Sequence, residues 1–496
     1  MENMQSNLPL IACLISLGAV LPICLFGEKR RNLREASTIL AGILKLSVVC
    51  MMVPLIAGGK VLNFTFIEIV PGIELAFKVD RFGIIFALVA SSLWIVTSIY
   101  SIGYMRGLHE HAQTRFYAFF AVALSTTLGV AFAGNLLTLY VFYELLSMST
   151  WPLVTHHQDK EAREGGRKYL TYLLGTSVGF LLPAMIFCYL KSGGNSLDFS
   201  QNGFVSSFVN EPTVAIVLLL LFVFGFAKAG LMPFHSWLPG AMVAPTPVSA
   251  LLHAVAVVKV GVFCIIRVFT GVFGIEFLQE LDIGQIVSYI AAFTVVVSSL
   301  IALSQDNLKR RLAFSTIGQL SYIILGISLL NVYGITGSMT HIAMHAFGKI
   351  TLFFCAGAIF EATGKKYISE MVGIGKRMPI TMIAFFIGAM SVIGLPFAGG
   401  FWSKFYLVWG TIANEQPVLL ITFLASSLLN GAYFFPIVFK AFFCKPEESL
   451  FEDKIEEAHP AAVIALSITA IGTVMLFIFP NPLFDLAKAA ATQFLS

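Results

Sequence analysis

Residues 226–262 read FAKAGLMPFHSWLPGAMVAPTPVSALLHAVAVVKVGV and set two lysines, Lys228 and Lys259, in apolar surroundings on either side of a proline-containing break. Each charge at the centre of a lipid-embedded helix costs about 2.5–3.5 kcal/mol on insertion scales. Ionisable residues at such a depth usually line an ion path and pair with another polar group. The stretch therefore predicts a functional site inside a helical membrane protein.

Composition places the whole chain in the membrane class. Hydrophobic residues make up 57% and charged residues 12% of the chain, and the mean hydropathy is +0.86. Apolar runs long enough to cross a bilayer, about 20 residues each, recur throughout. They lie near 8–26, 37–57, 80–102, 114–133, 135–153, 168–190, 213–232, 246–270, 284–304, 312–330, 336–360, 379–410, 417–442 and 462–481. We predict a single all-α polytopic transmembrane domain over 1–496 with about 14 spans.

The basic residues of the loops predict the orientation, because short cytoplasmic loops carry an excess of Lys and Arg. One set of alternate loops holds 19 Lys and Arg, whereas the opposite set with the C-terminal tail holds 4. We therefore expect both termini on the external side, and the net charge of +4 reflects topology and not nucleic-acid binding. The first run lacks a basic leader and should stay in the mature chain. We expect residues 58–79 to form an external hairpin and 444–460 an acidic cytoplasmic loop.

Several classes of site are excluded by the motifs that the chain lacks. Its seven cysteines are scattered without a C-x-x-C pair, so we expect no metal, cluster or disulfide framework. No phosphate-binding G-x-x-x-x-G-K-[ST] pattern is present, which disfavours nucleotide-driven transport. We expect no cofactor and no hydrolytic or redox site of the chain's own.

A second helix break echoes the first. GLPFAGGFWSKF at 394–405 places Pro396 and two glycines just before Lys404. Interrupted helices at corresponding positions are typical of the transport site in internally repeated transporters. We predict two inverted five-helix repeats, roughly 114–270 and 284–443, each with one broken helix.

Glu144, in LYVFYELLSMSTW, is the carboxylate of the fifth run. A buried carboxylate and a buried ammonium relieve each other's cost when they pair, so we expect contact between Glu144 and Lys228. The alternative is a static structural pair, which would leave the other lysines unexplained.

Lys259 lies too deep to snorkel and should face the bundle interior. His253 is six positions earlier and about 120° away on a helix, so the two need not share a partner. A histidine satisfied by a backbone carbonyl and a proton-relay residue remain equal alternatives for His253.

The run MTHIAMHAFGKITLFF sets His341, His345 and Lys349 at i, i+4 and i+8 on one helix face. Such a stripe suits a hydrated proton path, because histidine titrates near neutral pH. Haem or metal ligation by the two histidines is the alternative, although no second pair of ligands is evident.

Two accessory positions carry weaker signals. Asp306 begins a basic helix entrance and suits a helix N-cap better than a proton entry. His235 lies in the first break and suits a water-filled path.

These blocks, AKAGLMPFHSWLPGAMVAPTPVSALLHAVAVVKVGV, NLKRRLAFSTIGQLSY, HIAMHAFGK and GLPFAGGFWSKF, closely resemble the antiporter-like subunits shared by complex I, membrane-bound hydrogenases and Mrp multisubunit cation/proton antiporters. The resemblance covers nearly all fourteen runs. It implies a proton relay through a fixed set of side chains: Glu144, Lys228, Lys259, His341, His345, Lys349 and Lys404.

The resemblance is strongest to the Mrp D-type subunit. Lysine at Lys404, an end soon after the fourteenth run, and a sixth run without a buried aspartate all favour that type. It implies a component of a Na⁺ or K⁺/proton antiporter in a bacterial or archaeal cell membrane, together with other membrane subunits. A proton-pumping subunit of a complex I-like or hydrogenase complex is the alternative, and a scaffold without transport is a third.

Overall fold

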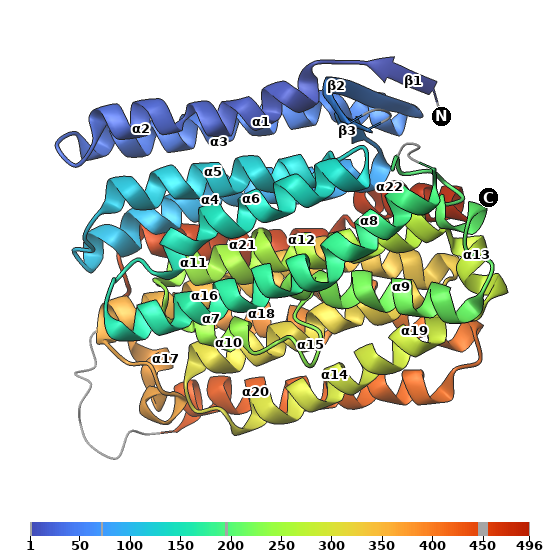
Figure 1. Ribbon diagram of the computed structural model, residues 1–496. Coiled ribbons are helices and arrows are strands. Elements are labelled where there is room, and N and C mark those ends of the chain that lie inside the picture. The colour runs from blue at the N-terminus through green and yellow to red at the C-terminus, as the bar shows by residue number, and fades with distance from the viewer. Residues whose placement is uncertain (1, 71–72, 194–196, 445–454, 496) are drawn as a thin grey trace.

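The structure is a computed structural model that describes residues 2–70, 73–193, 197–444 and 455–495. The helices run along one common direction, and both chain ends lie at the same end of the bundle (Figure 1). The first part of the chain forms β1 (Glu2–Gln5), α1 (Leu8–Gly18), α2 (Val20–Phe26), α3 (Arg31–Ala57), β2 (Lys60–Val70), β3 (Ile73–Val79), α4 (Arg81–Gly107), α5 (Gln113–Ala131), α6 (Leu136–Val154), α7 (Lys160–Thr176), the π-helical η1 (Ser177–Leu181), α8 (Leu182–Lys191), the 3₁₀ turn η2 (Val205–Ser207) and α9 (Pro212–Gly225).

The remainder of the chain is also helical. It forms the 3₁₀ turn η3 (Ala227–Ala229), α10 (Trp237–Gly240), the 3₁₀ turn η4 (Ala241–Val243), α11 (Thr246–Ala250), the π-helical η5 (Leu251–Val255), α12 (Val257–Arg267), the π-helical η6 (Val268–Phe273), α13 (Ile275–Glu280), α14 (Gly284–Ser304), α15 (Leu308–Ser328), α16 (Val332–Thr363), the 3₁₀ turn η7 (Ile368–Met371), α17 (Ile374–Arg377), α18 (Pro379–Ile393), α19 (Gly400–Ala413), α20 (Pro417–Phe443), α21 (Pro460–Ile478) and α22 (Asn481–Phe494).

Side-chain caps define where several long helices begin. Asp80, Asn135, Asp159, Asn307 and Asn331 each accept a hydrogen bond from a backbone N–H in the first turn of the following helix. The first N–H groups of a helix have no partner inside it, so these short polar side chains satisfy donors that lipid cannot.

A small sheet lies beside the N-terminal helices. β2 and β3 pair antiparallel, which confirms the predicted hairpin, and β1 pairs parallel to β2. The hairpin turn at 71–72 lies outside the described residues. The expectation of an all-α chain is therefore wrong for this sheet. Its two longer strands form because residues 60–79 alternate in the two-residue period of a strand.

The helix α16 is the centre of the bundle. It is buried along almost all of its length and packs against α4, α15, α18, α19 and α21. A helix that is apolar all round is stable only when other helices surround it. The predicted stripe of titratable residues on this helix therefore lies in the protein interior.

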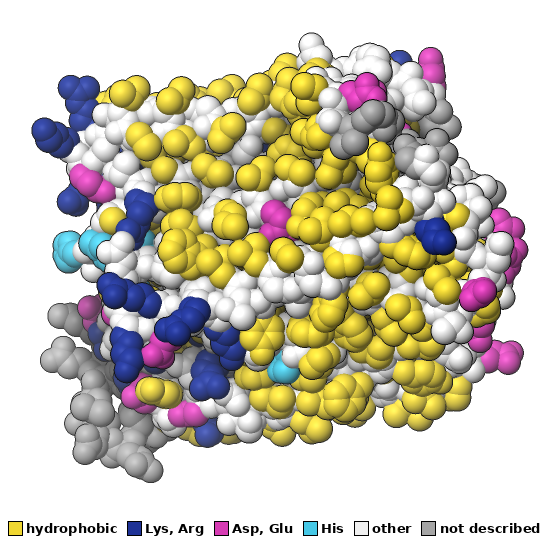
Figure 2. Space-filling view, in the orientation of Figure 1, with side chains coloured by type: hydrophobic (Ala, Val, Ile, Leu, Met, Phe, Trp, Pro, Cys, Tyr) yellow, Lys and Arg dark blue, Asp and Glu magenta, His cyan; other side chains and the backbone are white. Residues whose placement is uncertain are grey.

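The outer surface suits a membrane. Among the described residues, nine helices are long and apolar enough to cross a bilayer. Figure 2 shows a broad apolar band, with Lys and Arg gathered at the end opposite the chain termini. The chain is a multi-pass membrane protein.

The helices break where proline and glycine cluster. The helix α9 ends at Gly225 before η3, and α18 ends at Ile393 before α19 begins at Gly400, as the sequence predicts. The run near 246–270 is not the single regular helix that we expected. It contains two π-helical segments and a break at Ala256, where φ is −105° and ψ is −82°.

The predicted acidic loop falls only partly within the described residues. Positions 445–454 lie outside them. Further along, Glu456 contacts Arg377, and Glu457 accepts from the backbone N–H of Ile380 at the start of α18.

Candidate functional site

Lys228 lies in the short turn η3, fully buried, and points toward α6. Its Nζ donates to the carbonyl oxygen of Tyr143 at 2.6 Å and to Oγ of Ser147 at 2.7 Å. The same Nζ lies 3.1 Å from the centroid of the Tyr143 ring. Two oxygen acceptors and an aromatic face stabilise an ammonium that the apolar interior would otherwise destabilise.

The turn that carries Lys228 packs closely on α12. A Cβ at Gly261 would lie 2.1 Å from the backbone N of Ala229 and 2.4 Å from the carbonyl carbon of Lys228. Only glycine permits this approach. Gly261 therefore sets the position of Lys228 relative to the helix of Lys259.

The expected contact between Glu144 and Lys228 is absent. Within the described residues, neither carboxylate oxygen of Glu144 has a hydrogen-bond partner, although both are inaccessible to solvent. Lys228 is bound instead by Ser147 and Tyr143, which flank Glu144 on the same helix. The prediction was wrong because these nearer oxygens on the inner face of α6 satisfy the ammonium first.

Lys259 is fully buried on α12 and reaches α16. Its Nζ lies 2.6 Å from Nδ1 of His345, within hydrogen-bonding distance. The Nε2 atom of His345 has no partner among the described residues. This contact joins two helices that the sequence could not place side by side.

His341 lies one helical turn before His345 on α16 and connects it to α19. The two imidazole rings are stacked, with centroids 5.7 Å apart and planes inclined by 19°. Nδ1 of His341 lies 2.8 Å from Oγ of Ser403, and Nε2 lies 3.2 Å from Oε1 of Gln319.

Lys404 lies next to Ser403 at the start of α19. Its Nζ donates to the carbonyl oxygen of Ile393, 3.2 Å away at the end of α18, and lies 4.4 Å from the centroid of the Tyr322 ring. The ring of Tyr322 in turn stacks on His341 at 6.0 Å. Lys259, His345 and His341 thus form a polar series across the bundle, and Ser403 and the Tyr322 ring link this series to Lys404.

Lys349 shares the helix of the two histidines and contacts α15, as His341 does through Gln319. Its Nζ donates to Oγ of Ser315 at 2.8 Å, and Ser315 also accepts from the hydroxyl of Tyr433 at 3.0 Å. The three residues of the predicted stripe therefore do not share one neighbour: His345 contacts α12, His341 contacts α15 and α19, and Lys349 contacts α15. A drift of 40° per step along the stripe suffices for this change.

A cavity of about 770 Å³ opens at the basic end of the bundle. His235, Lys168, Lys309 and Glu110 are among the residues that line it. His235 is partly exposed and follows the break after Lys228, so its predicted place on a water-filled path is compatible with this geometry. The side chain of His253 lies outside the described part of the structure.

Asp306 is not the helix N-cap that we expected. The side chain of Asn307 caps α15 by accepting from the N–H of Arg310, whereas Asp306 is exposed and accepts from the N–H and hydroxyl of Ser369. Asp306 thus ties the start of α15 to η7.

Sequence reasoning missed a further fully buried lysine. Lys45 lies within α3, donates to the carbonyl oxygen of Leu124 at 2.9 Å, and faces the Trp94 ring at 4.9 Å. A lysine inside the apolar run 37–57 is the same signal that identified Lys228 and Lys259. Lys45 lies in the N-terminal layer, away from α12 and α16.

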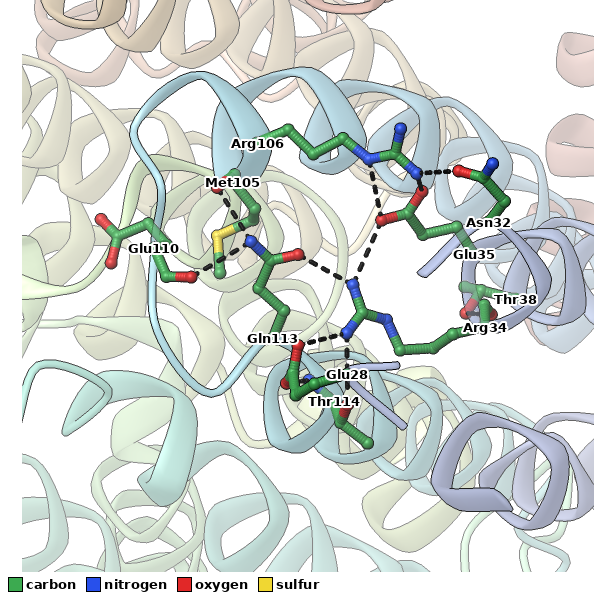
Figure 3. Close-up of polar contacts among 10 residues, drawn as sticks. All are labelled: Glu28, Asn32, Arg34, Glu35, Thr38, Met105, Arg106, Glu110, Gln113 and Thr114. Atoms are coloured by element: carbon green, nitrogen blue, oxygen red, sulfur yellow. Dashed lines mark hydrogen bonds and ion pairs between the residues drawn. The ribbon is translucent and has the colours of Figure 1, made fainter. Parts of the chain in front are cut away.

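A charged cluster fastens that layer at its basic end (Figure 3). Arg34 of α3 is fully buried, and its guanidinium donates to Glu35, Gln113 and Glu28. Arg106 of α4 contacts Glu35 from the other side. Paired charges of this kind keep α3, α4 and α5 in register where each would be costly alone.

Glu28 is the exposed member of this cluster and lies outside the spans. Burial alone raises the pKa of its carboxyl, but hydrogen bonds from Thr114 and the Arg34 guanidinium outweigh burial and hold the pKa below its ordinary value. Glu28 therefore remains charged at neutral pH.

Two known protein families match most of the chain. The model described as "NADH:quinone oxidoreductase/Mrp antiporter, TM" matches residues 133–430, and one described as "NADH-Ubiquinone oxidoreductase (complex I), chain 5 N-terminus" matches 70–117. The first match includes every residue of the polar series described above.

Individual relatives divide between two kinds of complex. The NADH-quinone oxidoreductase subunit N of Desulforudis audaxviator is 34% identical over 384 residues, which are 75% of this chain and 73% of that protein. A component of a probable K⁺/H⁺ antiporter of Rhizobium meliloti is 33% identical over 72% of this chain and 36% of that protein. Other relatives are matched over little more than half of their own length.

The fold has a solved counterpart. A chain of the membrane-bound sulfane sulfur reductase, an archaeal respiratory membrane complex, has a TM-score of 0.83 and 23% identity. The alignment covers 99% of this chain and 98% of that chain. At 23% identity this similarity shows a shared fold and nothing about function.

Proposed function

Because this chain belongs to the NADH:quinone oxidoreductase/Mrp antiporter transmembrane family, we propose that it moves protons across the membrane as one subunit of a multisubunit complex. The observation that carries this proposal is the contact of 2.6 Å between Nζ of Lys259 and Nδ1 of His345. It joins a buried amine to a buried imidazole, two groups that exchange protons readily.

In the proposed path a proton enters from the cavity that His235 lines and reaches Lys228. From there it passes through water to Lys259, then to His345 and His341, and leaves through Lys404. Ser403 and Tyr322 bridge the last step, since the first lies 2.8 Å from His341 and the second contacts both His341 and Lys404. Lys349 serves a side branch toward Ser315 and Tyr433.

The carboxylate of Glu144, which has no hydrogen-bond partner among the described residues, supplies the switch. Lys228 rests on Ser147 and Tyr143, one helical turn or less from Glu144. A rotation of the lysine side chain toward Glu144 would stabilise its charged form, and a return to Ser147 would favour proton release. Glu144 is thus a second, alternative partner, and no static ion pair is required.

We also propose the finer topology that the sequence suggests. About fourteen crossings, two inverted repeats over roughly 114–270 and 284–443, and external termini agree with the two helix breaks and with the basic end opposite the termini. The protein would lie in a bacterial or archaeal cell membrane.

Two kinds of complex are candidates for driving the proton movement, and a different observation supports each. Lysine at Lys404 and the K⁺/H⁺ antiporter relative support a Na⁺ or K⁺/proton antiporter. The subunit N relative, matched over 73% of its length, supports a redox-driven proton pump. Vesicles that contain the whole complex separate them. A Na⁺ or K⁺ gradient moves protons in the first case, whereas only an electron donor with its acceptor does so in the second.

The relay itself is tested by Lys259→Met in the same vesicles. The chain offers a matched control in Lys45→Met, since both lysines are fully buried. We expect Lys259→Met to abolish proton flux and Lys45→Met to leave it unchanged. Normal flux in the Lys259→Met complex would refute the relay.

A further inference from the structure

Two loops at the basic end bring histidines together around one carboxylate. Glu110 and His111 follow α4, and His156 and His157 follow α6. The Oε2 atom of Glu110 lies 3.6 Å from Nδ1 of His157 and 3.8 Å from Nε2 of His156. The rings of His111 and His156 have centroids 4.7 Å apart. Three potential ligand atoms, one each from Glu110, His111 and His157, lie within 4.8 Å of one another.

The fourth member of the group is His156, whose surroundings include Glu110 and the backbone of His111. The side chain of His156 is fully buried, and within the described residues neither of its ring nitrogens has a hydrogen-bond partner. A buried polar group without a partner costs free energy of about 1–3 kcal/mol. Its Nε2 faces Glu110, so a group bound at that carboxylate would also satisfy His156.

The two loops are held in place from outside the cluster. The backbone carbonyl of Glu110 accepts from Nε2 of Gln113 at 3.1 Å, and the backbone carbonyl of His156 accepts from Arg115 at 2.8 Å. Gln113 and Arg115 both belong to α5, which therefore aligns the two loops. Such a preorganised set of side chains is what a bound ion requires.

We propose that Glu110, His111 and His157, supported by His156, bind a divalent transition-metal ion of the zinc type. Neutral imidazoles and one carboxylate are the ligands that Zn²⁺ takes in proteins, with bonds of about 2.0–2.2 Å. Ligand atoms around such an ion lie about 3.3–3.5 Å apart, so closure from the observed spacing needs a shift of about 1 Å. His111 is exposed and His157 is partly exposed, so both side chains have room for this shift.

A metal ion at this site would affect the entry of protons into the cavity. Glu110 and His157 line the same cavity as His235, at the basic end of the bundle. An ion bound there adds positive charge at the mouth of the cavity and repels incoming protons. This consequence rests on the proposed function, whereas the binding does not.

Binding is measured on the purified whole complex by equilibrium dialysis against ZnCl₂ and metal analysis. We expect His111→Ala and His157→Ala each to weaken one Zn²⁺ site by about 10-fold or more, since even loss of a supporting residue costs 10–100-fold. His109→Ala is the matched control, because His109 is exposed and lies beside the cluster without belonging to it. Equal zinc contents in wild type and in both variants overturn the site.

Two further measurements separate this proposal from the proposed function. X-ray absorption of the zinc-loaded complex should show N and O ligands at about 2.0–2.2 Å, and their loss in His157→Ala supports the site without any transport assay. In vesicles, Zn²⁺ added on the basic side should slow proton flux in wild type but not in His157→Ala. Intact binding without inhibition would overturn the role at the cavity mouth and leave the metal site standing.

Discussion

Lys259 on α12 and His345 on α16 meet at 2.6 Å in the interior of the bundle, and neither residue has a carboxylate partner among the described ion pairs. The contact joins α12, which lies between two π-helical segments, to the central helix α16, which is buried along almost all of its length. A buried amine whose contact is with an imidazole is sensitive to small changes in that neighbour.

The first prediction concerns His345. In His345→Gln the amide oxygen can still accept from Lys259, so the complex should assemble, but the side chain no longer titrates. We expect proton flux to fall about tenfold or more, in line with the usual contribution of general acid–base groups. Flux is measured with a pH-sensitive dye in vesicles, and assembly by gel filtration. Unchanged flux would show that His345 is structural only.

The second prediction concerns Glu144, whose carboxylate has no hydrogen bond to lose within the described residues. Glu144→Gln should therefore leave the melting temperature of the complex almost unchanged and still reduce proton flux, because the alternative partner of Lys228 is gone. Glu276→Gln, an exposed carboxylate at the start of α13, serves as the control. A flux equal to that of the control would remove Glu144 from the mechanism.

The third prediction tests the close packing beneath Lys228. Gly261→Ala places a methyl group 2.1 Å from a backbone atom, so the turn η3 must move and we expect a loss of about 1–3 kcal/mol in stability. Gly175→Ala is matched to it, since a Cβ there meets nothing within 4 Å and should stabilise α7 by about 0.5–1 kcal/mol. Thermal unfolding of the two complexes gives the comparison. Equal stability would mean that η3 tolerates displacement.

The fourth prediction is the pH dependence of the contact between Glu28 and Arg34. Because the folded-state pKa of Glu28 is lowered, its stabilisation is present above the unfolded pKa and is lost as the pH falls through the folded pKa. Glu28→Gln should destabilise the complex at pH 7 by at most about 1 kcal/mol, since the side chain is half exposed. The difference should shrink as the pH falls below the ordinary pKa of glutamate, about 4.3, and vanish below the lowered folded-state pKa of Glu28. A difference that persists there would assign the effect to packing.

The fifth prediction concerns the buried Lys45. Replacement of a buried charge by an apolar side chain of similar volume is often neutral or stabilising, so Lys45→Met should retain or raise the melting temperature. Differential scanning fluorimetry of the purified complex measures this. A marked loss would show that Lys45 holds the N-terminal layer together through its bond to Leu124.

Much of the fold follows from local sequence. The apolar runs, the strands of residues 60–79 and the breaks before η3 and α19 depend on composition, two-residue alternation and clusters of proline and glycine. The π-helical turns around Ala256 could not be predicted in this way, because they adjust one helix to its neighbours.

The identity of the buried charges was also determined by the sequence, since a lysine within an apolar run needs no fold to be recognised. Their partners were decided by tertiary structure. Lys228 contacts Ser147 and not Glu144, and the residues of the α16 stripe do not share one neighbouring helix. The histidine cluster joins two loops that are distant in the chain. Helical periodicity determines which residues share a face, but only the packing of the helices determines which atoms that face meets.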